Sequence, residues 1–195
     1  MPTHAAEPSP ELNKQTFFRE NARVIVIDDR CGDLSHPGDM TNAMCKHWAK
    51  SSELFHVKDI QGSTPEEKIE DFRVKLLAVV GSDFKNIVVI LDRDLGIGNL
   101  PLADNVERSS AAYIDDRNDG PALVPHIRKW LDNPPIVGFT GEGDISGMSD
   151  LYGGARVVQK PDYNKLKDNL VEAFAEAHME RHALREATLP RLTQE

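Results

Sequence analysis

The sequence predicts an α/β protein with a doubly wound parallel sheet and helices on both faces. Short runs rich in β-branched apolar residues recur along the chain, and helical patterns separate them. These runs are apolar throughout, which is typical of strands that a parallel sheet buries on both faces. The chain has 195 residues, of which 39% are hydrophobic and 28% charged. This length and composition suit one globular domain with additional segments.

Five strands are predicted, four of them from strong apolar runs. The four are Arg23–Asp28, Asn86–Asp92, Pro135–Thr140 and Ala155–Lys160. The fifth, Leu54–Ile60, alternates only in part between apolar and polar residues, which favours an outer strand.

Four helices are expected between and after the strands. They cover Asp39–Ser52, Thr64–Gly81, Gly120–Asn133 and Asp162–Ala187. The second has the clearest boundaries, because Thr64 is a good N-cap, Pro65 suits the first turn and Gly81 ends the pattern. Pro125 weakens the early turns of the third.

The domain is expected to occupy residues 23–187, with an insertion at about 97–118. Residues 1–22 begin polar and Pro-rich and are predicted to be a flexible tail, and residues 188–195 a C-terminal tail. The sequence contains no evident secretory signal and no apolar run of membrane-spanning length, so we expect no membrane association.

The charge of the chain narrows the classes of partner. A formal net charge of −9 disfavours direct DNA binding, since phosphate backbones are bound by neutralising them. An acidic surface is better suited to divalent cations or to a basic protein partner. The two cysteines are too few for a disulfide framework, which favours a cytoplasmic location.

Polar side chains stand at the ends of four predicted strands. Asp28 and Asp29 end the first, Asp92 ends the next strong run, and Thr140 and Lys160 end the last two. The carboxyl ends of parallel strands share one edge of the sheet, so these side chains are expected to converge. Clustered carboxylates suit Mg²⁺, and a carboxylate can also form an aspartyl-phosphate beside a neutralising lysine.

Four segments together resemble the signatures of the response regulator receiver domain, in that family's order. They are VIVIDD, VVILDRDLG, IVGFTG and VVQKP, and the likeness covers roughly residues 23–183. The resemblance implies a flavodoxin-like fold with a five-stranded sheet. It also implies a stand-alone, atypical receiver, since little chain follows the last signature.

The resemblance implies that Asp92 accepts a phosphoryl group from a histidine kinase or phosphotransfer protein, with Mg²⁺ as cofactor. Asp29 would bind the metal directly and Asp28 largely through water. Asp92 and the backbone carbonyl of Asp94 would supply further ligands.

Three further residues take roles from the same resemblance. Thr140 would be the switch hydroxyl, Lys160 would pair with phosphoryl oxygens, and Pro161 would follow a cis peptide bond. The implied output is a phosphorylation-controlled contact with a downstream target protein, not catalysis on a separate substrate. The long final helix makes a homodimer one further option.

The connection between Asp92 and Thr140 is longer than the roughly 30 residues that a βαβ unit needs. Asp119-Gly120 resembles the family's start of the third helix, so the surplus falls within residues 97–118. Two interpretations remain open for it, namely a tolerated surface insertion and a lid or docking element beside the site.

Two further features depart from the family pattern. The family usually carries an aromatic residue three positions before the lysine, where this chain has Val157. Asp94 and Glu142 add acidic side chains two residues beyond Asp92 and Thr140, where they are candidates for tuning the lifetime of the phosphoryl group.

Two other functions compete with a phosphorylated receiver. The first is a receiver-like interaction domain that is not phosphorylated, which the insertion and Val157 favour. The second is a haloacid-dehalogenase-type phosphatase, because Asp92 and Asp94 resemble its D-x-D motif. The order argues against the phosphatase, since that superfamily places the D-x-D strand before the acid pair, whereas here Asp28 and Asp29 come first.

Overall fold

The structure is a computed structural model that describes residues 10–30, 35–98, 100–102, 118–141 and 145–188. It confirms the predicted α/β class. A five-stranded parallel sheet has the order β2-β1-β3-β4-β5. Its strands are β1 (Arg23–Asp28), β2 (Ser51–His56), β3 (Ile87–Leu91), β4 (Ile136–Thr140) and β5 (Arg156–Gln159). The strand order reverses between β1 and β3, which is where doubly wound sheets bind ligands.

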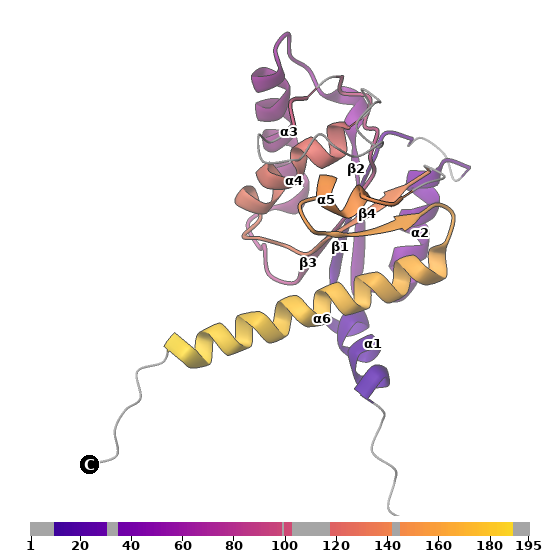
Figure 1. Ribbon diagram of the computed structural model, residues 1–195, viewed down its shortest axis with the longest axis vertical. Coiled ribbons are helices and arrows are strands. Elements are labelled where there is room, and N and C mark those ends of the chain that lie inside the picture. The colour runs from indigo at the N-terminus through magenta and orange to yellow at the C-terminus, as the bar shows by residue number, and fades with distance from the viewer. Residues whose placement is uncertain (1–9, 31–34, 99, 103–117, 142–144, 189–195) are drawn as a thin grey trace, which may run out of the picture.

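Helices cover both faces of this sheet (Figure 1). One face carries α1 (Pro10–Asn21), α2 (Pro37–Trp48) and α6 (Tyr163–Thr188). The other carries α3 (Pro65–Val80), α4 (Asp119–Trp130) and the short α5 (Met148–Leu151). The predicted flavodoxin-like arrangement is therefore confirmed.

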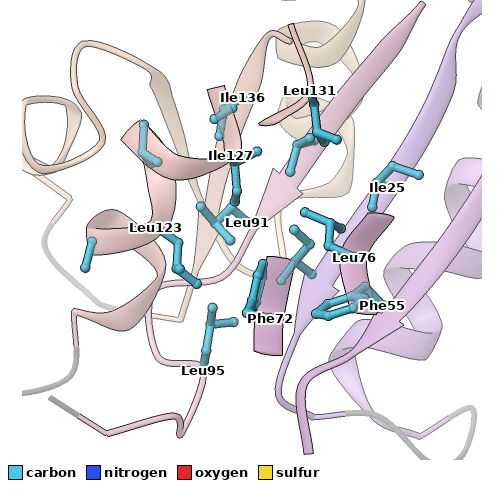
Figure 2. Packing of buried hydrophobic residues seen from close by; sticks show 14 of the residues in the cluster. Ile25, Phe55, Phe72, Leu76, Leu91, Leu95, Leu123, Ile127, Leu131 and Ile136 are labelled. Atoms are coloured by element: carbon cyan, nitrogen blue, oxygen red, sulfur yellow. The ribbon is translucent and has the colours of Figure 1, made fainter. Parts of the chain in front are cut away.

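Each strand contributes alternate side chains to two separate cores. In β1, Val24 and Val26 pack toward α6, whereas Ile25 and Ile27 pack toward α3 and α4. Figure 2 shows the second core, where Phe72 of α3 lies against Phe55 of β2. Burial on both faces explains why the inner strands are apolar throughout.

The predicted signals at the ends of α3 are confirmed. The Thr64 hydroxyl accepts a hydrogen bond from the Glu67 amide, and the Glu67 carboxylate accepts one from the Thr64 amide. This capping box satisfies amides that the first helical turn leaves unpaired. Gly81 ends the helix at φ 73°, a conformation that favours glycine.

The bounds predicted for the outer strand were wrong. β2 begins at Ser51 rather than Leu54 and ends at His56, and Val57–Asp59 form a 3₁₀ turn. Helix α2 accordingly ends at Trp48, before the predicted end at Ser52. An edge strand tolerates polar residues here because the Ser52 hydroxyl donates to Asn42 of α2 at 2.7 Å.

The prediction of a flexible tail over residues 1–22 was wrong for the part that the structure describes. Residues Pro10–Asn21 form α1, which lies against α6 (Figure 1). Phe18 is 1% exposed and meets the ring of Phe174 edge-on at 5.5 Å. The Lys14 ammonium pairs with the Glu172 carboxylate at 2.8 Å. Residues 1–9 lie outside the described part of the chain.

Other predicted segments fall largely outside the described residues. These are residues 189–195 of the C-terminal tail, and residues 99 and 103–117 of the insertion. Within the described residues, no helix is both long and apolar enough to cross a membrane.

The docking of α1 predicts a clear difference between two neighbouring phenylalanines. Replacing Phe18 with alanine empties a buried site and is expected to lower the free energy of unfolding by about 3–5 kcal/mol. Phe17 is 39% exposed, so Phe17→Ala should cost far less. Urea denaturation of both variants measures this, and equal losses would contradict a docked α1.

Candidate functional site

The sheet brings three aspartates together at one edge. In the register of β1 and β3, Ile27 pairs with Leu91, so the next residues along, Asp28 and Asp92, are neighbours. A carboxylate oxygen from each of Asp28, Asp29 and Asp92 lies within 4.8 Å of the others. The predicted convergence of these strand ends is observed.

Lys160 joins this cluster from the end of β5. Its ammonium donates to Asp28 Oδ2 at 2.7 Å and pairs with Asp92 Oδ2 at 2.9 Å. The backbone amide of Lys160 donates to the carbonyl of Thr140 at 2.6 Å, which ties the ends of β4 and β5 together. Thr140 and Lys160 line the same pocket of about 240 Å³ as Asp29 and Asp92.

Asp92 is held in a largely buried position. Its side chain is 10% exposed, and Oδ1 accepts a hydrogen bond from the Arg93 amide at 2.8 Å. Burial raises the pKa of Asp92 to about 6; the Asp28 charge adds to the rise, while Lys160 opposes it. The carboxylate is therefore poorly solvated and has a cation directly beside it.

The ammonium of Lys160 is stabilised by the same geometry. Burial alone would lower its pKa, but the charges of Asp92 and Asp28 outweigh this, and the pKa of Lys160 is raised. Lys160 therefore stays cationic and holds the two carboxylates near one another.

The remaining negative charge fits a divalent cation. Burial raises the pKa of Asp29, and the nearby charges of Asp28 and Asp94 raise it further, whereas Arg30 and Lys160 lower it. The carboxylates therefore still repel one another with the lysine in place. Mg²⁺ prefers oxygen ligands of this kind, usually one or two carboxylates with water. Asp29 and Asp92 are suited to hold such an ion.

Asp94 lines the same pocket, and its side chain has a local role. Its Oδ1 accepts a hydrogen bond from the Gly96 amide at 3.2 Å. This is an Asx-type contact, which shapes the loop that follows Asp92. Glu142, the other predicted modulating residue, lies outside the described residues.

Asp119 anchors the loop after Asp92 and was not predicted to do so. Its buried carboxylate accepts hydrogen bonds from the amides of Ile97 and Gly98 at 3.0 Å each and of Leu100 at 3.3 Å. From α3, the Lys68 ammonium donates to the Ile97 carbonyl at 2.7 Å. The base of the insertion is thus attached to two helices.

Gly120 lets α4 approach the backbone of Asp92 closely. A Cβ atom at this position would lie 1.8 Å from the carbonyl oxygen of Asp92, so any side chain would displace the backbone there. The Gly120 amide donates to the Arg93 carbonyl at 2.9 Å. Arg93 is itself buried and donates through Nε to Asn118 at 2.8 Å.

Only some of the contacts that hold the backbone around Asp92 could be predicted from the sequence. The Asp119-Gly120 pair marks the start of α4. The contact of Asp119 with Gly98 could not be predicted, because the two residues are far apart in the sequence. At the other side of the site, the Lys160–Pro161 peptide bond is cis, as predicted. Val157 is half-buried against the core of α3 and α4.

No protein-family model matches the chain, and no curated protein matches it in sequence. Solved structures do match. The receiver domain of NtrX from Brucella abortus is 18% identical with a TM-score of 0.46, and the match covers 78% of this chain and 98% of that one. The signal receiver domain of a putative LuxO repressor from Vibrio parahaemolyticus is 17% identical with a TM-score of 0.47, covering 84% and 97%.

A longer NtrX structure from Brucella abortus, in complex with ADP, is 19% identical with a TM-score of 0.50. The match covers 89% of this chain but only 31% of that protein. At this identity the likeness concerns the fold. This chain has the receiver-domain fold. In this fold, the acidic cluster lies at the carboxyl edge of the sheet.

The loop anchor predicts a loss of stability when Asp119 is neutralised. Asp119→Asn removes the charge that three amides share and should lower the free energy of unfolding by about 1.5–3 kcal/mol, the range for hydrogen bonds to charged groups. Hydrogen exchange at the Ile97 and Gly98 amides should accelerate as well. The matched control is Asp83→Asn, because Asp83 is exposed and accepts one local bond from the Lys85 amide. A variant of Asp119 that behaves like this control would contradict the anchoring role.

Proposed function

We propose that this chain is a phosphoacceptor receiver domain, in which Mg²⁺-dependent phosphorylation of Asp92 switches a protein–protein interaction. One observation carries the proposal. The buried Asp92 carboxylate lies 2.9 Å from the Lys160 ammonium and within 4.8 Å of two further carboxylates. A nucleophile, a cation for phosphoryl oxygens and oxygen ligands for a metal thus occupy one pocket.

The residues divide the chemistry among them. A carboxylate oxygen of Asp92 attacks phosphorus, and the bond from phosphorus to the donor nitrogen breaks. Asp29 and Asp92 would hold Mg²⁺, with Asp28 acting through water and the carbonyl of Asp94 as a further ligand, and the ion would supply positive charge to neutralise the phosphoryl oxygens. Lys160 binds one of these oxygens, and the hydroxyl of Thr140 donates to another. Hydrolysis of the acyl phosphate returns Asp92 and inorganic phosphate.

This chemistry implies a set of partners. The phosphodonor is a histidine kinase or a phosphotransfer protein, and the output is docking to a downstream target protein. The proposal includes a cytoplasmic location, no direct DNA contact and no membrane contact, and it keeps a homodimer as one possible output. The chain is proposed not to act as an enzyme on a separate substrate, beyond gain and loss of its own phosphoryl group.

The two competing functions differ from this proposal in what happens to phosphate. An interaction domain without phosphorylation would form no adduct, and Val157 in place of the usual aromatic residue favours that alternative. A phosphatase of the haloacid-dehalogenase type would release phosphate continuously.

The decisive experiment is intact mass after incubation with acetyl phosphate and Mg²⁺. We expect one phosphoryl group on the unmodified chain and none on Asp92→Asn. Asp83→Asn is the matched control, since it removes an exposed carboxylate from the connection that precedes β3 and should be modified normally. No adduct and no released phosphate would support the interaction domain, and sustained turnover would support the phosphatase.

Replacing Lys160 is expected to separate phosphorylation of Asp92 from the structural change that follows it. In Lys160→Ala, Asp92 and the metal ligands remain, so we expect a phosphoryl group to be accepted. The cation that draws β5 toward the phosphoryl group is lost, so the accompanying change in backbone amide resonances should be lost too. Circular dichroism checks that the variant is folded. A folded variant with an undiminished spectral response would contradict this role.

A further inference from the structure

Tyr152 follows the short helix α5, and its side chain contacts β3 and β4. It is fully buried, with 0% of its surface exposed. Its own amide donates to the carbonyl of Met148 at 3.1 Å, and its carbonyl accepts from the Ala155 amide at 3.3 Å. The backbone of Tyr152 is therefore continuous with both α5 and the start of β5.

The ring of Tyr152 covers Gly138 in the middle of β4. A Cβ atom on Gly138 would lie 3.0 Å from both Cε1 and Cζ of the ring, so the missing side chain makes the space that the ring fills. Gly138 precedes Thr140 by two residues, and alternate residues of a strand face the same side. The ring therefore lies on the face of β4 from which Thr140 projects.

The same ring lies beside the position where this chain lacks an aromatic residue. Gly138 of β4 pairs with Val157 of β5, and the side chains of paired residues in a parallel sheet share a face. Both Tyr152 and Val157 belong to the core of α3 and α4. An aromatic ring is thus present next to position 157, but it comes from another part of the chain.

The hydroxyl of Tyr152 reaches the strand that carries the acceptor. It donates to the carbonyl of Leu91 at 3.2 Å, and Leu91 is followed directly by Asp92. A buried tyrosine needs such a partner for its hydroxyl. Burial raises the pKa of Tyr152 well above its usual value, and the charge of Asp92 raises it further, consistent with the short path between the two side chains.

We infer that Tyr152 couples the phosphoacceptor Asp92 to the edge of the domain formed by α5 and β5. The inference rests on the proposed function and deepens it. When Thr140 binds a phosphoryl oxygen, the end of β4 moves toward Asp92, and the ring over Gly138 moves with it. The displacement reaches α5 and β5 through the backbone of Tyr152. The hydroxyl of Tyr152, bonded to the Leu91 carbonyl, holds the ring in a fixed position relative to β3.

The test separates the hydroxyl from the ring. Tyr152→Phe keeps the ring over Gly138 and removes only the bond to Leu91. Tyr163→Phe is the matched control, because Tyr163 packs on Phe139 at the start of α6 and is not part of the link. Beryllium trifluoride with Mg²⁺ serves as the phosphoryl analogue for all three proteins.

Hydrogen exchange of the backbone amides over residues 148–159 provides the readout. In the unmodified chain we expect the analogue to change these exchange rates at least about fivefold, the lower end of typical coupling between sites. Tyr163→Phe should respond equally. Tyr152→Phe should still bind the analogue, seen as changes at the Asp92 and Thr140 amides, but show no change over 148–159.

The outcomes distinguish the two proposals. If Tyr152→Phe binds the analogue and its exchange rates over residues 148–159 change as much as in the unmodified chain, the coupling is overturned while the proposed function stands. Urea denaturation without the analogue compares the stability of the three proteins. Equal stability would show that a lost response does not come from general destabilisation. No analogue binding by the unmodified chain overturns the proposed function and the coupling together. If Tyr152→Phe does not fold, Gly138→Ala takes its place, because its Cβ displaces the ring and should abolish the same response.

Discussion

The contact of the Lys160 ammonium with two buried carboxylates is the interaction on which the site depends. A parallel sheet brings the ends of β1, β3 and β5 to one edge, and this places Asp28 and Asp92 side by side. Buried like charges are costly unless they are paired, and removing one partner of a buried ion pair typically costs about 3–5 kcal/mol. Lys160 offsets that cost only in part, since Asp29 adds a third carboxylate. The site therefore keeps the negative charge that makes a divalent cation favourable.

Asp92 is also supported by the helices on one face of the sheet. Asp119 at the start of α4 and Lys68 of α3 both bind the loop that follows Asp92. Gly120 brings α4 against the carbonyl of Asp92 itself. Because packed elements hold this loop, its backbone has little freedom to adjust. Packed protein interiors transmit strain, so a displacement of this loop would reach the neighbouring strands.

The sequence predicts those site residues that neighbouring residues in the chain identify. Apolar runs that end in a charge or a hydroxyl located Asp28, Asp92, Thr140 and Lys160, because strand ends and polar residues are both visible along the chain. It missed the start of β2, since an edge strand tolerates Ser51 and Ser52 where an inner strand would not.

Features that depend on tertiary contacts were beyond sequence reasoning. Helix α1 has a weak apolar pattern of its own and is stabilised by the docking of Phe18 on Phe174. The contact of Asp119 with Gly98, and that of Tyr152 with Leu91, join residues far apart in sequence. In each case the side chain type was visible, but its partner was set by the fold.

The bonds from Asp119 to the amides of Gly98 and Leu100 also bear on how this protein can diverge. They close the two ends of the inserted segment, so its length enters the folding free energy only logarithmically, at about 0.6 kcal/mol for each doubling. Descendant proteins can therefore lengthen, shorten or rewrite this segment at little cost in stability. A lineage can in this way vary the segment by insertion and deletion while the fold around it stays intact.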